Sequence, residues 1–361
     1  ELEAWRQVEP ENEVLYLKLT NREKVSRYVE KRASIDMKKY AMVYDREIGL
    51  GVRGRMNKLW GYAAAILVLC VIGVTIWMNE LKQNEANQLA QVTIEPGRAK
   101  ALLVLDDGQE IELDDHKTSK VLEESGIVIV NDSSRVEYRP ASRMGEKEVM
   151  NKIIVPTGGE YNLILSDGTR VYLNAESVIT FPKHFTGERR EVTLEGEAYF
   201  HVTASKEHPF IVKTKDMDVM VTGTEFNVNT YGIGGTQTTL VSGKVGIRGK
   251  GSGREYMMEP SQLAEFDVNG EFKGIRNVNA GTYTAWKEGF FVFENEGLED
   301  ILNRLSRWYD VDVFYGSEKV KGYHFTGHME KYEDVEIILN AISKMVGVHF
   351  TIKDRTIVIT E

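Results

Sequence analysis

The feature that most constrains this chain of 361 residues is an uncharged, apolar run over residues 59–78. At a helical rise of about 1.5 Å per residue, such a run spans about 30 Å, the thickness of a bilayer's hydrocarbon core. Trp60 and Tyr62 lie near one end and Trp77 near the other, where aromatic rings prefer the headgroup level. Two other interpretations of the run fit less well. A buried core helix of this length would carry a polar face, and a cleaved signal peptide would stand at the N-terminus. We therefore predict one transmembrane helix over residues 59–78.

The charges beside this run predict its orientation. The N-terminal flank carries three basic residues, Arg53, Arg55 and Lys58. The C-terminal flank has no positive excess. The positive-inside rule then places residues 1–58 in the cytoplasm and residues 79–361 across the membrane. The single cysteine, Cys70, lies within the run, so the outer part has no disulfides, which is compatible with a bacterial periplasm. We expect a single-pass inner-membrane protein with a cytoplasmic N-terminus and periplasmic C-terminal domains.

Residues 1–58 form a predicted cytoplasmic helical segment. Apolar residues recur there at helical spacing, which indicates short amphipathic helices with a very small common core. These stripes are either that core or a surface for a partner, and the candidate partner contacts are Val14, Leu17, Val25 and Val29. Since the first residue is Glu1, we expect this segment to be truncated at its N-terminus.

The outer part begins with a polar, helix-compatible stalk over residues 79–92 and continues as an all-β domain over residues 93–283. Alternating apolar and polar residues with Asp-Gly turns favour antiparallel strands. A repeat recurs sixty residues on: Pro96, Leu103, Leu105, Asp107, Gly108 and Leu113 return as Pro156, Leu163, Leu165, Asp167, Gly168 and Leu173. Stacked hairpins of this kind predict a β-sandwich or a solenoid-like fold.

Residues 284–361 read as a separate α+β domain of two βαβ-type units. Its repeat is offset by 37: Glu299, Ile301, Leu302, Asn303, Ser306 and Val311 match Glu336, Ile338, Leu339, Asn340, Ser343 and Val348. Small units of this kind leave strand edges on which a partner can add a strand. The candidate edge is the last strand, Thr356, Ile357, Val358 and Ile359.

The chain offers little chemistry for an enzyme. The net charge of −10 has no basic block, which argues against direct contact with nucleic acid. Seven histidines stand without cysteines outside the apolar run, and no Gly-x-Ser-x-Gly or Walker loop occurs. We expect no metal, no cofactor and no enzymatic activity on a substrate. The composition favours a binding and signalling protein.

The outer β domain also resembles a known family. The resemblance is carried by the runs at 155–161, 165–169, 173–175, 181–182, 190–192, 196–200, 209–210, 221–228 and 243–245, among them Val-Pro-Thr-Gly-Gly-Glu-Tyr, Leu-Asn-Ala, Gly-Glu-Ala-Tyr-Phe and Val-Thr-Gly-Thr-Glu-Phe-Asn-Val. In this order they are similar to the FecR family of bacterial transmembrane sigma-factor regulators. The C-terminal domain is similar to the one in Bacteroidetes-type members, itself like a short domain of secretins and TonB-dependent transducers. The segment around Trp5 resembles the family's anti-sigma segment, without its upstream helix.

The resemblance implies a relay across three compartments. A TonB-dependent outer-membrane transducer would contact the periplasmic part, and the cytoplasmic part would then release or activate an extracytoplasmic-function sigma factor. The alternative is a membrane-tethered periplasmic binding or scaffold protein, for example one that binds glycan, without sigma regulation.

Some members of the resembled family are cut at a Gly-Thr bond, and this chain has Gly223-Thr224 in the corresponding run. The Thr224 hydroxyl would attack the Gly223 carbonyl, and water would hydrolyse the resulting ester. The simpler interpretation is that this pair only begins a strand.

Overall fold

The computed structural model describes residues 94–114, 121–124, 127–132, 135–140, 149–232 and 234–361, together with Asn12. Contacts divide the chain into two units, Glu1–Ala86 and Asn87–Glu361, and all described residues except Asn12 belong to the second. The predicted cytoplasmic helices, membrane helix and stalk lie outside the described residues. No helix among the residues described is long and apolar enough to cross a bilayer.

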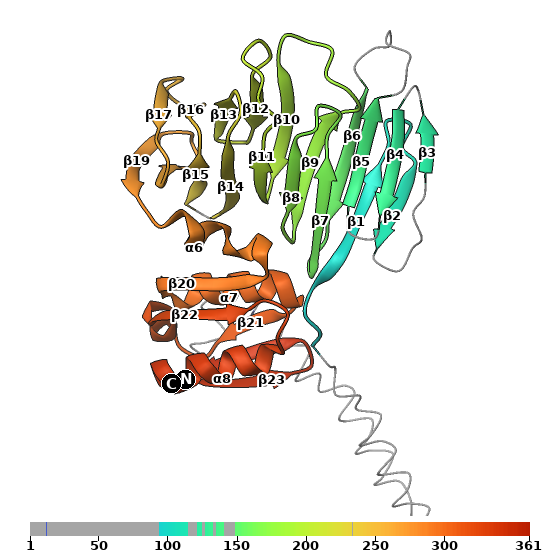
Figure 1. Ribbon diagram of the computed structural model, residues 1–361. Coiled ribbons are helices and arrows are strands. Elements are labelled where there is room, and N and C mark those ends of the chain that lie inside the picture. The colour runs from blue at the N-terminus through green and yellow to red at the C-terminus, as the bar shows by residue number, and fades with distance from the viewer. Residues whose placement is uncertain are drawn as a thin grey trace, which may run out of the picture. The chain divides into compact units, whose positions relative to one another are not determined.

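The first part of the described chain is a β body of two layers (Figure 1). The first layer has the strand order β2 (Glu110–Asp114), β1 (Arg98–Val104), β6 (Met150–Val155), β9 (Ser177–Pro182), β10 (Arg190–Glu195), β12 (Phe210–Lys213), β13 (Met217–Val221), β16 (Val245–Gly249) and β17 (Glu255–Met258). The second has the order β3 (Val121–Glu124), β4 (Ile127–Asp132), β5 (Arg135–Pro140), β7 (Gly159–Ile164), β8 (Arg170–Leu173), β11 (Glu197–His201), β14 (Glu225–Gly232), β15 (Gly235–Ser242), β18 (Gln262–Phe266) and β19 (Phe272–Asn277).

Neighbouring strands in both layers follow the order of the chain, apart from the exchange of β1 and β2. The chain therefore passes back and forth between the layers while it advances along one axis. Alternate residues of the strands face inward and form one apolar core that includes Leu103, Ile153 and Phe226. The β body thus combines the facing sheets of a sandwich with the progression of a solenoid, the two architectures that the sequence predicts.

The sixty-residue repeat is confirmed as two equivalent Asp-Gly hairpins. The Gly108 amide donates to the Leu105 carbonyl at 3.0 Å, and the Gly168 amide donates to the Leu165 carbonyl at 2.9 Å. The aspartate before each glycine accepts the amide two residues further on, at 2.8 and 3.0 Å. Both glycines have positive φ, +84° and +81°, which a residue with a Cβ adopts only at a cost.

The remaining residues form the C-terminal domain with its own core. Its elements are α6 (Ala280–Thr284), η1 (Ala285–Glu288), β20 (Phe290–Gly297), α7 (Leu298–Tyr309), β21 (Asp312–Tyr315), η2 (Glu318–Gly322), β22 (His324–Glu330), α8 (Val335–Val346), β23 (His349–Lys353) and β24 (Thr356–Thr360). The 37-residue repeat is visible in the last turn of each long helix. Ser306 donates to the Val311 carbonyl and Ser343 to the Val348 carbonyl, each at 2.6 Å.

The sheets of this domain differ from the predicted pairing. Each unit has the strand-helix-strand order, but its two strands belong to different sheets: β20 pairs with β22, and β21, β24 and β23 form the second sheet. The prediction that the last strand is an edge is wrong, because β24 lies between β21 and β23. Ile357 and Ile359 face the core, and the backbone of β24 pairs with β21 on one side and with β23 on the other. Among the described residues, β21 and β23 are the outer strands of that sheet.

Candidate functional site at the domain junction

The candidate site lies where the C-terminal domain meets the end of four neighbouring strands of the β body. The order β7-β8-β11-β14 brings to one end of the second layer four polar residues, Glu160, Asn174, Glu197 and Asn227. All four belong to the runs that carry the family resemblance. Antiparallel neighbours place the start of one strand beside the end of the next, so residues distant in sequence meet here.

The centre of the junction is the buried ammonium of Lys331, which follows β22. The Lys331 side chain is 0% exposed, and its Nζ lies 2.6 Å from Oε2 of Glu160 on β7. The ammonium also lies 3.7 Å from the centroid of the Trp308 ring and 5.5 Å from that of Trp286. The Tyr332 hydroxyl donates to the other Glu160 oxygen at 2.6 Å. Glu160 therefore receives two hydrogen bonds from consecutive residues of the C-terminal domain.

This position changes the proton affinity of the lysine. Burial lowers the pKa of the Lys331 ammonium, and the Glu160 carboxylate opposes that shift. A fully buried cation is tolerated because the carboxylate and the indole face replace its hydration. Removal of either partner would leave the other charge without its counter-ion at a buried position, which is strongly unfavourable.

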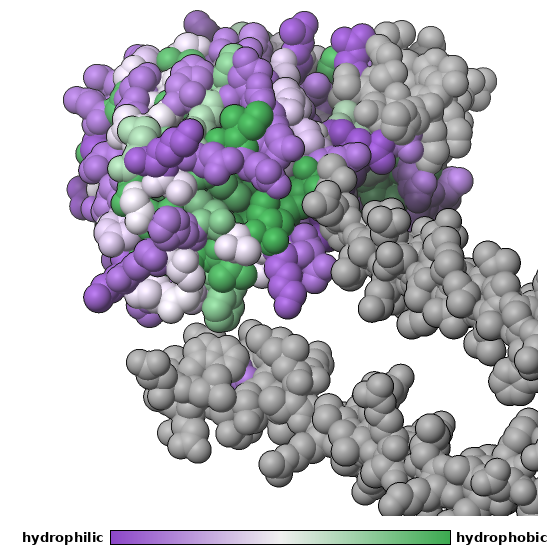
Figure 2. Space-filling model, turned by 90° about the horizontal axis from the view of Figure 1, so that it is seen from below, coloured by the Kyte–Doolittle hydropathy of each residue, from purple (hydrophilic) through white to green (hydrophobic). Residues whose placement is uncertain are grey.

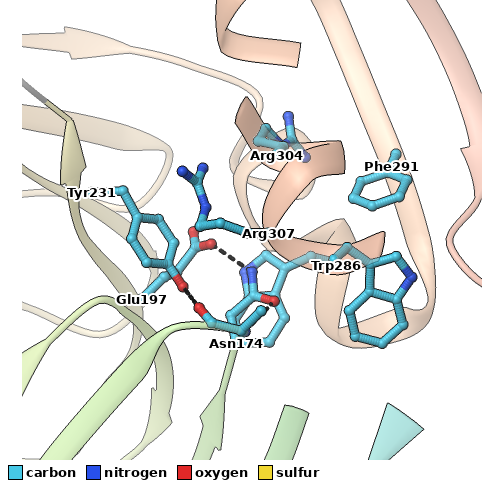
Figure 3. Close-up of a pocket in the computed structure, with 9 residues that line it drawn as sticks. Asn174, Glu197, Tyr231, Trp286, Phe291, Arg304 and Arg307 are labelled. Carbon is cyan, nitrogen blue, oxygen red and sulfur yellow. Dashed lines mark hydrogen bonds between the residues drawn. The ribbon is translucent and has the colours of Figure 1, made fainter. Parts of the chain in front are cut away.

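A second polar connection runs through Trp286 of η1. Its indole Nε1 donates to Asn227 Oδ1 at 3.2 Å, and Asn227 Nδ2 donates to Glu197 Oε1 at 2.9 Å. Asn174 Nδ2 donates to the other oxygen of Glu197 at 2.8 Å (Figure 3). In this row of hydrogen bonds, the Asn227 amide group and both Glu197 carboxylate oxygens have partners. The row therefore fixes the orientation of η1 on the β body.

Arg307 and Tyr231 close the side of the junction. The Arg307 guanidinium lies 4.1 Å from the centroid of the Tyr231 ring, and the Tyr231 hydroxyl donates to the Ala175 carbonyl (Figure 3). The same hydroxyl lies 3.0 Å from Ser177 Oγ. Burial raises the pKa of the Tyr231 hydroxyl, which therefore stays neutral. The cavity between these groups measures about 20 Å³, enough for about one water molecule. The junction is thus a contact between domains and not a pocket for an organic ligand.

The segment that leads into β1 passes through the same junction. Ile94 is buried in the core of the C-terminal domain, whereas Arg98 donates its amide to the Gly158 carbonyl of the β body at 3.1 Å. The Gly158 amide donates in turn to the Arg307 carbonyl at 2.7 Å. A Cβ on Gly97 would lie 2.6 Å from the Trp308 ring, so the segment fits only because this residue is glycine.

The Gly223-Thr224 pair lies elsewhere, between β13 and β14. Gly223 has φ +148°, and a Cβ there would lie 2.8 Å from Ala204. Thr224 is 4% exposed and its hydroxyl donates to the Lys244 carbonyl at 2.9 Å. The glycine is therefore required by the packing of the chain. The hydroxyl would have to leave Lys244 to attack the Gly223 carbonyl.

The other predicted site residues are not brought into this junction. Thr356, Ile357, Val358 and Ile359 form the central strand of the second sheet of the C-terminal domain. Val14, Leu17, Val25 and Val29 lie outside the described residues. Lys331 was not among the predicted site residues, because no motif includes it. Its partner Glu160 does lie in one of the runs that carry the resemblance. Within the described residues, no three His, Cys, Asp or Glu side chains are grouped to hold a metal ion.

Comparison with known proteins identifies the domains. A model of the FecR protein family matches residues 151–246, and a model of the FecR C-terminal domain matches residues 290–359. A crystal structure of a candidate anti-sigma factor from Parabacteroides distasonis is 30% identical, with a TM-score of 0.54 over 58% of this chain and 98% of its own. The chain belongs to the FecR family.

A second crystal structure of a candidate anti-sigma factor from Parabacteroides distasonis is similar to this FecR-family chain. It is 29% identical with a TM-score of 0.54, and the match covers 59% of this chain and 99% of that one. No curated protein matches the sequence significantly. Glu160 lies within the match to the FecR protein model and Lys331 within the match to the FecR C-terminal model, so their ion pair joins the two matched regions.

Proposed function

We propose that this FecR-family protein is a transmembrane anti-sigma regulator. The observation that carries the proposal is the similarity of 58% of this chain to 98% of the crystallised chain of a candidate anti-sigma factor. Residues 1–58 would bind an extracytoplasmic-function sigma factor in the cytoplasm, and residues 59–78 would cross the inner membrane. The apolar run and the basic flank before it support this arrangement.

The outer domains would receive the signal from a TonB-dependent transducer in the periplasm. The C-terminal domain offers the surface for this contact. Ile337 and Met345 of α8 are exposed at 56% and 68%, and Phe314 on β21 is exposed at 37%. Seen from below, the molecule shows hydrophobic residues gathered near the middle of the face with hydrophilic residues around them (Figure 2). Since β24 is central, its residues 356–359 offer no free edge. The transducer would instead pair with one of the outer strands, β21 or β23.

The test of sigma binding uses the full chain. We expect the purified protein to retain a sigma factor, identified by mass spectrometry, and the double variant Leu17→Asp/Val29→Asp to lose it. Burying two unpaired carboxylates in an apolar interface costs several kcal/mol, about a thousandfold in affinity. The matched control is Ser26→Asp/Ser34→Asp, which adds the same charges at polar positions of the same segment.

Sigma binding that survives Leu17→Asp/Val29→Asp would contradict the proposed contact surface. No sigma factor on the wild-type chain would instead favour a tethered periplasmic binding protein.

We also propose that the Gly223-Thr224 bond is the site of any self-cleavage of the periplasmic part. The Thr224 hydroxyl belongs to the residue directly after that bond, and it is buried beside a glycine with positive φ. We expect two fragments from the wild type on a denaturing gel and one intact band from Thr224→Ala. Thr224→Ser, which keeps a hydroxyl, should still be cut. A single wild-type band, or equal cleavage of Thr224→Ala, would exclude this reaction.

A further inference from the structure

One junction holds both the C-terminal domain and the segment 94–98 that leads into the β body. Ile94 packs in the C-terminal core, Gly97 lies under the Trp308 ring, and Arg98 is bonded to Gly158. Toward the N-terminus, this segment leads to the predicted stalk and membrane helix. Any change in the docking of the C-terminal domain must therefore change what residues 94–98 contact.

We propose that the Lys331–Glu160 ion pair is a releasable clamp, and that its opening separates the C-terminal domain from the β body and frees residues 94–97, which precede β1. This inference rests on the proposed relay across the membrane, to which it adds the part that moves. It concerns the contact between two domains of one chain.

The chemistry of the junction favours a clamp with two discrete states. Four polar connections link the domains: the Lys331 and Tyr332 bonds to Glu160, the Trp286 bond to Asn227, and the bond from Gly158 to the Arg307 carbonyl. The two apolar cores are separate. A polar interface between domains can open without unfolding either domain, since its groups regain hydrogen bonds to water.

The ion pair is the contact on which docking depends most. Lys331 is 0% exposed, whereas the Glu160 side chain is 23% exposed. Without the Glu160 charge, Lys331 would stay buried as an unpaired cation, which is strongly unfavourable. The domain can avoid that state by moving away and hydrating the ammonium. Loss of one carboxylate therefore favours the open state.

Hydrogen exchange of the full chain in detergent micelles tests the clamp. In Glu160→Lys, we expect exchange in peptides covering residues 94–98 and 157–161 to rise by at least about tenfold. Peptides from the core strands β10 and β14 should exchange as in the wild type. Glu160→Gln, which keeps the shape of the side chain, should shift the same peptides in the same direction to a smaller extent.

The matched control reverses the charge of a similar ion pair on the surface. Lys213 and Glu191 are also 2.6 Å apart, but their side chains are 42% and 39% exposed. Exposed pairs of this kind contribute little to stability. Glu191→Lys should therefore leave exchange at 94–98 and 157–161 unchanged.

A disulfide provides the reverse experiment. A Cβ on Gly158 would lie 3.6 Å from Asp310 Cβ, which is within the range for a disulfide. In a Cys70→Ala background, Gly158→Cys/Asp310→Cys should restore slow exchange to Glu160→Lys when oxidised and lose it when reduced. The controls are Gly158→Cys and Asp310→Cys, each made alone in the same background, because neither can form the disulfide.

Unchanged exchange in both Glu160 variants would overturn the clamp, and so would exchange that rises equally in β10 and β14, because the pair would then only support global folding. Failure of the oxidised disulfide to restore protection would also overturn it. None of these measurements needs a sigma factor. If the wild-type chain binds no sigma factor, that result contradicts the proposed function and does not affect the evidence for the clamp.

Discussion

At the scale of single residues, the polar members of the family motifs have a common location. Glu160, Asn174, Glu197 and Asn227 stand in four separate runs of the sequence, yet they meet at one end of the β body. There they bind Lys331 and Trp286 of the C-terminal domain, directly or through one another. Two of the motif glycines, Gly196 and Gly223, act differently, since they relieve steric contacts inside the β body. The motifs therefore combine local scaffold with a junction between domains.

A glycine prediction separates backbone strain from steric contact. Gly196 has φ +98°, and a Cβ there would lie 2.6 Å from Ser177 Cα. Gly108 has φ +84° with open space around it. We expect Gly108→Ala to lower the free energy of unfolding by about 1 kcal/mol and Gly196→Ala by about 3 kcal/mol or more. Urea unfolding of both variants measures this, and equal losses would contradict the steric argument.

At the scale of elements, the two long helices show how a repeat diverges. They occupy equivalent positions, but Asp334 caps α8 by accepting the Glu336 amide at 2.8 Å, whereas Gly297 before α7 provides no side-chain cap. Asp310 and Gly347 end the helices in the same left-handed conformation. The helices α7 and α8 thus end with the same type of C-terminal cap and differ in their N-terminal caps.

This difference predicts opposite effects of two substitutions. Asp334→Ala removes a cap and should lower the free energy of unfolding by about 1 kcal/mol. Gly297→Ser adds a cap at an extended position, φ −65°, where a Cβ would meet nothing closer than 3.8 Å, and should raise it by about 0.5 kcal/mol. Thermal unfolding of both variants is the measurement. Destabilisation by Gly297→Ser would show that this glycine is needed for another reason.

At the scale of the whole molecule, the proposed topology joins a small inner segment to a large outer part. A direct measurement uses fusions to alkaline phosphatase, which folds only where disulfides form. We expect activity after residue 361 and none after residue 50, since the positive-inside rule places only the first of these points in the periplasm. The reverse pattern, or activity at both points, would contradict the proposed orientation. The arrangement matters because the relay requires its two ends in different compartments.

The sequence by itself determined the local structure of this protein. The Asp-Gly pairs specified turns, the alternation of apolar residues specified strands, and both repeats returned as equivalent hairpins and equivalent helices. These features depend on neighbours within a few residues, so a pattern in the sequence is enough to find them.

Only the tertiary structure decided which strands pair and which charges are buried. The composition of the last strand fits an edge as well as a centre, and β24 is central because it pairs with the distant strand β21 as well as with its hairpin partner β23. Lys331 reads as one more surface lysine until β7 places Glu160 beside it and Trp308 covers it. Contacts between residues 171 positions apart leave no periodic signal, because they arise from packing of whole domains.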